Sequence, residues 1–458
     1  MVNYTSEYQL EIEEFNSLYQ LDLNPENRWI QLGAHLPWDL LVKIYSKRIN
    51  LEKGAKTINP RVVIGAFIVK HKLNLTDQET LQTISENPYI QFFLGQRMFC
   101  TKFLFSPTLF VEFRKRMGKD CFDDFSEELM KIAYPETIGK ENQSEQNLPN
   151  KGSLKLDATV ADQYISYPND LGLINEARIK TENIIDLLFE QLREDILIKP
   201  KTYRKVAHAR YMSEAKKRQK NKASLRKAIR YLLNCVERNI KTINNMLDML
   251  EGRDYQLPLK SLRQLWIINT LYEQQRKMYQ EKSNQCNDRI VSISQPHVRP
   301  IVRGKQGKRV EFGSKLGLSL MDGFVKADTL SWNAYNEAHD LKIQAQAYKS
   351  LYGYYPEIIQ VDKIYGTNQN RAWCKERSIR LTVTPKGRQP KKTPYQKRKE
   401  RKEYGERNQV EGKFGQAKQG YGLNQIKAKL KETSETWIGA ILFLINCIKF
   451  AEISGFTF

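Results

Sequence analysis

Tyr404-Gly405-Glu406-Arg407-Asn408-Gln409-Val410-Glu411 is the most informative stretch of this sequence, and its pattern continues to Lys418. If the stretch is helical, residues advance by about 100° each, and four polar side chains share one helix face: Tyr404, Arg407, Glu411 and Lys418. An adjoining apolar strip would seat the helix on a core: Val410, Phe414 and Ala417. The polar face would then lie at the edge of a cleft. The alternative is a solvated face on which Arg407 and Glu411 form an i,i+4 ion pair.

The spacing of this stretch, Tyr-x2-Arg-x3-Glu-x6-Lys, resembles the signature around the third catalytic carboxylate in one branch of the DDE-type transposases of bacterial insertion sequences. Two upstream segments strengthen the resemblance. Leu154-Lys155-Leu156-Asp157-Ala158-Thr159-Val160, followed by Tyr167 to Arg178, is similar to the family's first-aspartate strand and the helix after it. Ile358-Ile359-Gln360-Val361-Asp362-Lys363-Ile364-Tyr365 is similar to its second. Ile364 departs from the pattern, because the family usually has a glycine after Asp-Lys.

The C-terminal third of the chain alternates strand and helix patterns. Asp322-Gly323 lies between two apolar runs, 316–320 and 324–329, and predicts a hairpin. A helix over 334–352, the Asp362 strand and a further strand over 379–383 follow. This order predicts an α/β fold with a ribonuclease-H-like mixed sheet. The resemblance places Asp157 on the central strand, Asp362 at the end of the neighbouring strand and Glu411 on a helix that crosses behind them.

The predicted organisation has three parts. Residues 1–135 form an all-α N-terminal domain, 136–153 a linker, and 154–458 the catalytic domain with a long helical insertion at about 170–285. In the first part, Pro60 opens one apolar helix, Thr76-Asp77-Gln78-Glu79 caps the next, and Ser106-Pro107 starts a third that ends at Gly118. The resemblance implies that this domain binds the ends of the element, although helical packing alone would produce the same apolar spacing.

The insertion is expected to be helical and basic. Its helices are predicted over 175–197, 213–251 and 262–282. Residues 199–230 contain many lysines and arginines and few acids, which favours a grip on the DNA backbone over a solvated basic face. The candidate contacts in this segment are Arg218, Lys220, Lys222 and Arg226.

Composition agrees with a polyanionic partner. The chain has 74 Lys and Arg against 52 Asp and Glu, a formal net charge of +22, which favours salt-sensitive attraction to nucleic acid. The six cysteines and five histidines are scattered without ligand spacing, so neither a zinc site nor a disulfide framework is indicated. We expect a reducing cytoplasm, no secretory leader and no membrane span, with the apolar run Trp437 to Ile445 forming a buried helix.

The resemblance implies a specific chemistry. Asp157, Asp362 and Glu411 would hold two Mg²⁺ ions, for which Mn²⁺ substitutes, and these would stabilise the charge that develops during phosphoryl transfer. Phosphates beside the scissile bond would be bound by Arg407, Lys418, Tyr404 and Lys363. Two basic loops would approach the duplex, one with Arg303, Lys305, Lys308 and Arg309 and one over 386–402, the second of which could instead be a disordered linker. His339-Asp340 is interpreted as structural, because adjacent helix residues point apart.

The resulting hypothesis is a transposase that binds double-stranded DNA at the element ends and at the target, assembles as a homodimer on that DNA, and works in the bacterial cytoplasm near the nucleoid. Two alternatives remain open at this level. One is a non-catalytic DNA-binding protein that retains the fold, for which Ile364 is the only hint. The other is a ribonuclease-H-fold nuclease or Holliday-junction resolvase, which would require neither the N-terminal domain nor the pattern from Tyr404 to Lys418.

Overall fold

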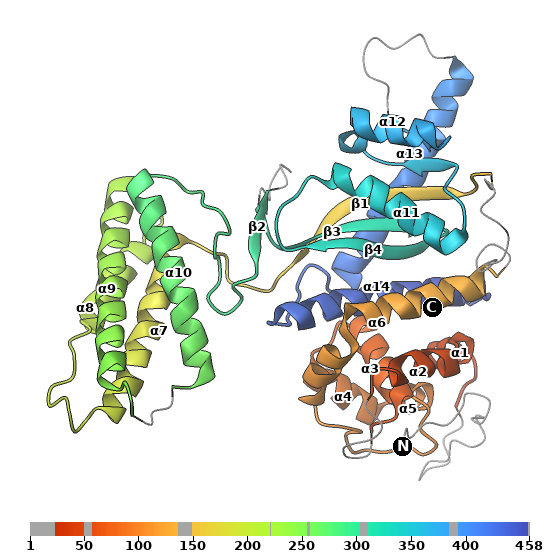
Figure 1. Cartoon of the computed structure of the whole chain (residues 1–458). Coiled ribbons are helices and arrows are strands. Elements are labelled where there is room, and N and C mark those ends of the chain that lie inside the picture. The colour runs from red at the N-terminus through yellow and green to blue at the C-terminus, as the bar shows by residue number, and fades with distance from the viewer. Residues whose placement is uncertain are drawn as a thin grey trace. The chain divides into compact units, whose positions relative to one another are not determined.

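The computed structural model describes residues 23–49, 57–135, 149–219, 221–253, 257–302, 310–383 and 393–456. The chain forms two compact units. The first unit comprises Met1–Tyr164, Ser314–Ser331 and Tyr335–Phe458, and the second comprises Ile165–Gly313 and Trp332–Ala334. Figure 1 shows the elements of each unit along the chain.

A mixed sheet organises the first unit. Its strands are β1 (Ser153–Asp162), β3 (Val310–Met321), β4 (Phe324–Ser331), β5 (Ile358–Gln360) and β6 (Arg380–Leu381). β1 lies between β3 and β5, β6 pairs with β5, and β4 pairs with β3. The β1–β5 and β5–β6 pairs are parallel and the β3–β4 pair is antiparallel. The predicted ribonuclease-H-like mixed sheet, with the Asp157 strand at its centre, is therefore confirmed.

The hairpin between β3 and β4 forms where the sequence predicts it. Asp322 and Gly323 have φ values of 50° and 90°, and two consecutive residues with positive φ are what a tight two-residue hairpin turn requires. A further strand, β2 (Arg299–Val302), pairs antiparallel with the Val310–Gly313 part of β3. These residues of β2 and β3 belong to the second unit.

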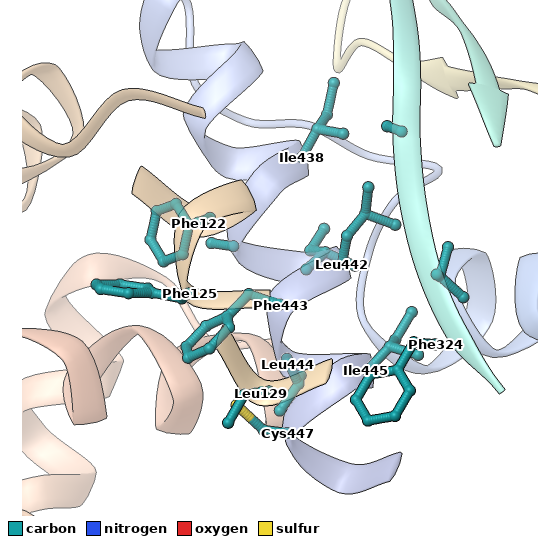
Figure 2. Packing of buried hydrophobic residues seen from close by; sticks show 14 of the residues in the cluster. Phe122, Phe125, Leu129, Phe324, Ile438, Leu442, Phe443, Leu444, Ile445 and Cys447 are labelled. Carbon is teal, nitrogen blue, oxygen red and sulfur yellow. The ribbon is translucent and has the colours of Figure 1, made fainter. Parts of the chain in front are cut away.

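Helix α14 (Lys431–Ile453) is the central core element of the first unit. It packs against α6 (Leu109–Ala133) and β4, and Figure 2 shows Phe443 of α14 beside Phe122 and Phe125 of α6. Among the described residues α14 is long and apolar enough to cross a membrane, but 83% of its most apolar part is buried within the protein. The predicted buried helix at Trp437 to Ile445 is confirmed.

One polar contact ties α14 to the sheet. The side-chain amide of Asn446, which is completely buried, accepts a hydrogen bond from the Val325 N–H and donates one to the Val325 carbonyl, both at 2.8 Å. A buried amide with both functions satisfied fixes the position of α14 along β4, because any shift would leave a buried backbone group without a partner.

The described part of the N-terminal region is helical. Its helices are α1 (Arg28–His35), α2 (Trp38–Ser46), α3 (Pro60–Lys72), α4 (Asp77–Glu86), α5 (Pro88–Phe93) and α6. The start of α3 at Pro60 and the capping box of Thr76 with Glu79 are confirmed. The expectation that the third helix ends at Gly118 is wrong. Gly118 has a φ of 65° and kinks the chain, but the helix resumes because Phe122 and Phe125 continue its buried face.

The helices before β1 and the sheet share one continuous hydrophobic core, and they belong to the same compact unit. The boundary between an N-terminal domain at 1–135 and a catalytic domain at 154–458 stays a prediction. Most of the proposed linker, 136–148, lies outside the described residues.

The second unit contains four helices among its described residues: α7 (Asp170–Gln191), α8 (Arg204–Ala215), α9 (Lys222–Met249) and α10 (Leu259–Glu281). They form two hydrophobic clusters. The long helix predicted over 213–251 is wrong at its start, because α8 ends at Ala215 and α9 begins at Lys222. The side chain of Asn221 accepts a hydrogen bond from the Ala223 N–H and caps the new helix.

Further described helices of the first unit lie between β4 and α14 in the sequence. They are two short 3-10 helices, η3 (Glu337–His339) and η4 (Lys363–Tyr365), and the helices α11 (Asp340–Tyr352), α12 (Asn368–Glu376) and α13 (Pro394–Gly415). The single helix predicted over 334–352 is thus η3 followed by α11. Between Asp362 and α13 the described chain contains η4, one helix and one strand, as the spacing predicts, with 384–392 outside the described residues.

Candidate active site

Asp157 lies on β1, and Asp362 lies two residues beyond the end of the neighbouring parallel strand β5. The β1–β5 ladder pairs Lys155 with Gln360, and each aspartate lies two residues beyond its member of that pair. Residues two apart in a strand point to the same face. The Asp157 carboxylate accepts a hydrogen bond from the Ala158 N–H at 2.8 Å, and the Asp362 carboxylate caps η4 by accepting one from the Lys363 N–H at 2.6 Å.

Helix α13 is tied to three successive parallel strands. Thr393 and Gln396 form its capping box. Along the helix, an i,i+3 row of side chains faces the sheet and makes three contacts: Glu403 with Arg380 of β6 at 2.6 Å, Glu406 with Gln360 of β5 at 3.0 Å, and Gln409 with Lys155 of β1 at 3.0 Å. Val410 is buried beside this row. These contacts fix the rotation of α13 and bring Glu411 to the Asp157 end of the sheet.

The pKa of the Asp157 carboxyl is raised in the folded protein. Burial raises the pKa of this half-buried carboxyl, and the nearby carboxylates of Glu337 and Glu411 raise it further. The Ala158 N–H and the Arg407 guanidinium act in the opposite direction. Asp157 therefore lies within electrostatic reach of two glutamates and one arginine, and a like charge nearby disfavours its ionised form.

Arg407 and Glu411 form the ion pair that the sequence left as an alternative. The Arg407 Nη2 to Glu411 Oε1 distance is 3.4 Å, with the arginine side chain 11% exposed and the glutamate side chain 58% exposed. The guanidinium also lies 5.1 Å from the centroid of the exposed Tyr404 ring. Three members of the predicted helix face are thus together in the structure.

The fourth member, Lys418, lies in a different local geometry. The chain from Gln416 to Gly420 is a π-helix, so the assumption of regular α-helical spacing through Lys418 is wrong. The wider turn buries Ala417 and lets its carbonyl accept a hydrogen bond from the Leu423 N–H at 3.0 Å. Lys418 therefore does not have the angular position that regular α-helical spacing gives it relative to Tyr404, Arg407 and Glu411. Its side chain is half-buried.

Ile364, the residue that departs from the family pattern, fits its position. It lies in η4 with its side chain 48% exposed. It is not among the described residues with positive φ, so the turn after Asp362 does not require a glycine there. Lys363 is exposed beside it.

The donor set suits a hard divalent cation, because it consists of carboxylate oxygens. Among the described residues, no three Asp, Glu, His or Cys side chains converge closely enough to hold a metal ion in this arrangement. Each carboxylate instead has a partner within the protein: a backbone N–H for Asp157 and for Asp362, and Arg407 for Glu411. The pKa of Asp157 is raised mainly by burial and then by the charges of Glu337 and Glu411. A cation would offset those two charges, and the fit to the ion rests on the chemistry of the carboxylate donors.

The candidate DNA contacts of the second unit differ in their surroundings. Arg218 and Lys222 are exposed. Arg226 is half-buried, with its guanidinium 4.0 Å from the centroid of the Tyr279 ring and a 2.7 Å hydrogen bond to the Tyr279 carbonyl, so it holds α9 against α10. Five candidates lie outside the described residues: Lys220, Arg303, Lys305, Lys308 and Arg309. The 386–392 part of the second basic segment lies outside them as well, and the prediction of a loop or disordered linker is wrong for 394–402, which form the first turns of α13.

Two further observations concern residues near η3. The structural interpretation of Asp340 is confirmed, because its carboxylate accepts hydrogen bonds from Tyr335 at 2.6 Å and Thr329 at 3.0 Å. Glu337 contributes charge to the Asp157 site, yet no sequence pattern predicted it. The signal available was only its place two residues before His339, at the start of the helical segment after the hairpin.

Comparison with known proteins gives two matching family models. A family model described as "Transposase DDE domain" matches residues 359–449, which include Asp362 and Glu411, and one described as "Transposase domain (DUF772)" matches residues 17–116. A Rhizobium meliloti protein described as "Uncharacterized protein ORF8 in nfe locus" is 25% identical over 155 residues, which cover 34% of this chain and 71% of that protein. No solved structure matches the chain. Both matched models describe transposase domains, and the one over the region of Asp362 and Glu411 is of the DDE type.

Proposed function

We propose that this transposase cleaves DNA strands at the ends of its insertion sequence and joins the 3′ ends to target DNA, with Asp157, Asp362 and Glu411 as the catalytic carboxylates. The observation that supports this assignment is the β1–β5 register, in which Asp157 and Asp362 each lie two residues beyond the Lys155–Gln360 pair, together with the anchoring of α13, which contains Glu411, to β1 and β5. Each of the three matches the family pattern at its own position in the sequence.

DDE transposases generally use divalent metals, and two Mg²⁺ ions, or Mn²⁺ in their place, would neutralise the charge that builds on the phosphoryl oxygens. The chain's own residues would hold and position the reactants. Asp157, the most buried of the three carboxylates, would hold the ions together with Asp362 and Glu411. Each carboxylate would exchange its present partner for the cation.

Arg407 has two roles in this proposal. Without DNA its guanidinium pairs with Glu411. With DNA and cations present, Glu411 would bind the cation and the guanidinium fork would be free to donate to two oxygens of a phosphate beside the scissile bond. Tyr404, Lys363 and Lys418 would contact neighbouring phosphates. These contacts would position the scissile strand for in-line attack.

Affinity for DNA would come mainly from the basic surface. The net charge of +22 supplies long-range attraction, and the exposed Arg218 and Lys222 of the second unit are the described candidates for backbone contacts. We propose double-stranded DNA at element ends and target as the partner, a homodimer assembled on it, and the cytoplasm near the nucleoid as the place of action. The N-terminal helices are proposed to bind the element ends.

The test is a cleavage assay with labelled element ends and Mg²⁺. Asp157→Asn, Asp362→Asn and Glu411→Gln should each abolish strand cleavage, because they keep side-chain size but remove the charge that holds the cations, while DNA affinity stays near that of the wild type. Glu406→Gln is the matched control: it changes a carboxylate of the same helix whose partner is Gln360, and it should retain cleavage. Cleavage by Glu411→Gln at the wild-type rate would remove Glu411 from the site.

A further inference from the structure

A groove of about 600 Å³ lies between the first half of α13 and the strands β5 and β6, of which β6 is the edge strand of the sheet. On the strand side it is lined by Ile358, Gln360 and Arg380. On the helix side it is lined by residues at positions i, i+3, i+4 and i+7 of one helix face: Tyr395, Arg398, Lys399 and Lys402. We call this cavity the α13 groove. Its volume falls in the range of about 300–1,000 Å³ that is typical of small-molecule sites.

The α13 groove carries an excess of positive charge. Arg380 forms an ion pair with Glu403 at 2.6 Å. The other three cations are exposed, and no ion pair among the described residues involves any of them: Arg398, Lys399 and Lys402. Cations gathered along a concave surface attract an anion. The segment 384–392, which precedes α13 in the chain, contains four lysines and arginines, so its charge makes it a poor occupant of the groove.

Gln360 brings an unused hydrogen-bond acceptor to the groove. Its side chain is 1% exposed, and its Nε2 donates a hydrogen bond to the Glu406 carboxylate at 3.0 Å. An ionised carboxylate only accepts, so this contact fixes which end of the Gln360 amide is the nitrogen. The Oε1 atom is buried without a hydrogen-bond partner among the described residues. A buried carbonyl oxygen without a donor is unfavourable, and an occupant of the groove that carries an N–H group would supply that donor.

The lining also offers a surface for a flat ring. The Tyr395 side chain is 75% exposed, so its ring is accessible on the helix side of the groove. Ile358, on the strand side, is apolar and half-buried. Nucleobases stack on aromatic side chains, and every base carries an N–H group. A nucleotide therefore combines the three properties that this lining favours: a phosphate, a flat ring and an N–H donor.

We propose that the α13 groove binds one nucleotide, with its phosphate at the three unpaired cations, its base on Tyr395, and an N–H group of the base donating to Gln360 Oε1. Glu406 holds Gln360 in place and does not contact the nucleotide. The inference goes beyond the proposed strand cleavage, because it requires neither a metal ion nor a catalytic carboxylate. A free nucleotide and an unpaired nucleotide of a DNA strand offer the same chemistry. The competing account is a solvated groove that attracts any anion without recognising a base.

The experiment uses 2-aminopurine, a fluorescent base whose emission falls when it stacks on an aromatic ring. The full chain, without divalent cations, is titrated into the 5′-monophosphate of 2-aminopurine deoxyriboside and, separately, into a single-stranded pentanucleotide with 2-aminopurine at its centre. Saturable quenching of the monophosphate identifies a free nucleotide as the ligand. Saturable quenching of the pentanucleotide alone identifies an unpaired nucleotide of a strand. The absence of saturable quenching in both titrations would overturn the proposal.

Lys399→Ala and Lys397→Ala form a matched pair of variants. Both remove one exposed lysine of α13, but only Lys399 lines the groove. Lys399→Ala should weaken binding by about 10-fold, a loss typical of removing a hydrogen bond to a charged group, and Lys397→Ala should bind the probe as the wild type does. Equal losses in the two variants would show that the probe responds only to net charge, which contradicts a site in the groove.

Two further positions test the contacts of the base. Tyr395→Leu should abolish quenching and Tyr395→Phe should retain it, because stacking needs the ring and not the hydroxyl. Gln360→Leu removes the acceptor and should weaken binding by about 2-fold to 10-fold. Unchanged binding in both Tyr395→Leu and Gln360→Leu, or displacement of the probe by inorganic phosphate as readily as by dAMP, would reduce the groove to an anion-attracting surface and refute the nucleotide site. The measurement involves no cleavage, so its failure would leave the proposed catalytic function standing.

Discussion

Replacing Arg407 by alanine separates catalysis from stability. In the structure the side chain makes one 3.4 Å ion pair with Glu411, whose carboxylate is 58% exposed, and one contact with the Tyr404 ring at 5.1 Å. An exposed i,i+4 pair contributes about 0.3–0.5 kcal/mol, and an exposed cation–π contact contributes about 0.5–1 kcal/mol. The expected loss of stability is therefore about 1 kcal/mol, which lowers the thermal midpoint of a 458-residue chain by roughly 1 °C.

The expected effect on cleavage is much larger. If the guanidinium holds a phosphate beside the scissile bond, its removal takes away a preorganised donor, and such losses typically slow catalysis by about 100-fold to 1,000-fold. Arg407→Lys should restore part of the rate, because an ammonium supplies charge but cannot reproduce a planar fork. The assay is single-turnover cleavage of labelled element ends with Mg²⁺, run beside a thermal melt of each variant.

Arg193→Ala provides the matched control, since Arg193 forms an exposed 2.8 Å pair with Glu190 in the second unit. It should change stability by a similar small amount and leave cleavage unchanged. The reasoning is refuted by a folded Arg407→Ala protein that cleaves at the wild-type rate, because that outcome reduces Arg407 to the ion pair seen in the structure.

Three other predictions follow from named contacts. Replacing Arg218 and Lys222 by alanine should flatten the slope of log K against log salt by about 0.9 for each phosphate that the protein no longer neutralises, whereas Arg226→Ala, whose guanidinium lies on Tyr279, should leave the slope unchanged. Asp157→Asn should raise the thermal midpoint of the cation-free protein at neutral pH. Because the pKa of Asp157 is raised in the folded protein, folding disfavours the ionised carboxylate, and stability is lost as pH rises above the ordinary range of aspartate. The gain in thermal midpoint from Asp157→Asn should disappear below that range, where the carboxyl group is protonated in both the folded and the unfolded state. Asn446→Leu leaves the Val325 N–H and carbonyl without side-chain partners in the core, and urea unfolding should show a loss of about 2–6 kcal/mol, since each unsatisfied group costs about 1–3 kcal/mol.

The sequence by itself determined those features that local chemistry decides. The Asp322-Gly323 hairpin forms because these residues accept positive φ, and the capping box at Thr76 forms because both of its partners lie within four residues. The Arg407–Glu411 pair follows from helical spacing. The strand order followed from the resemblance and from the alternation of strand and helix patterns, because few topologies accommodate that order.

The tertiary structure alone decided which charges meet. Arg226 lies in a basic segment, yet its guanidinium packs on the Tyr279 ring and donates a hydrogen bond to the Tyr279 carbonyl of another helix. No local sequence pattern predicts such a contact. Glu337 and Asp157 are far apart in the chain, yet the charge of Glu337 raises the pKa of Asp157, and Asn370 holds η3, which contains Glu337, against η4. Local propensity acts over a few residues, whereas the composition of a buried site depends on which segments the sheet brings together.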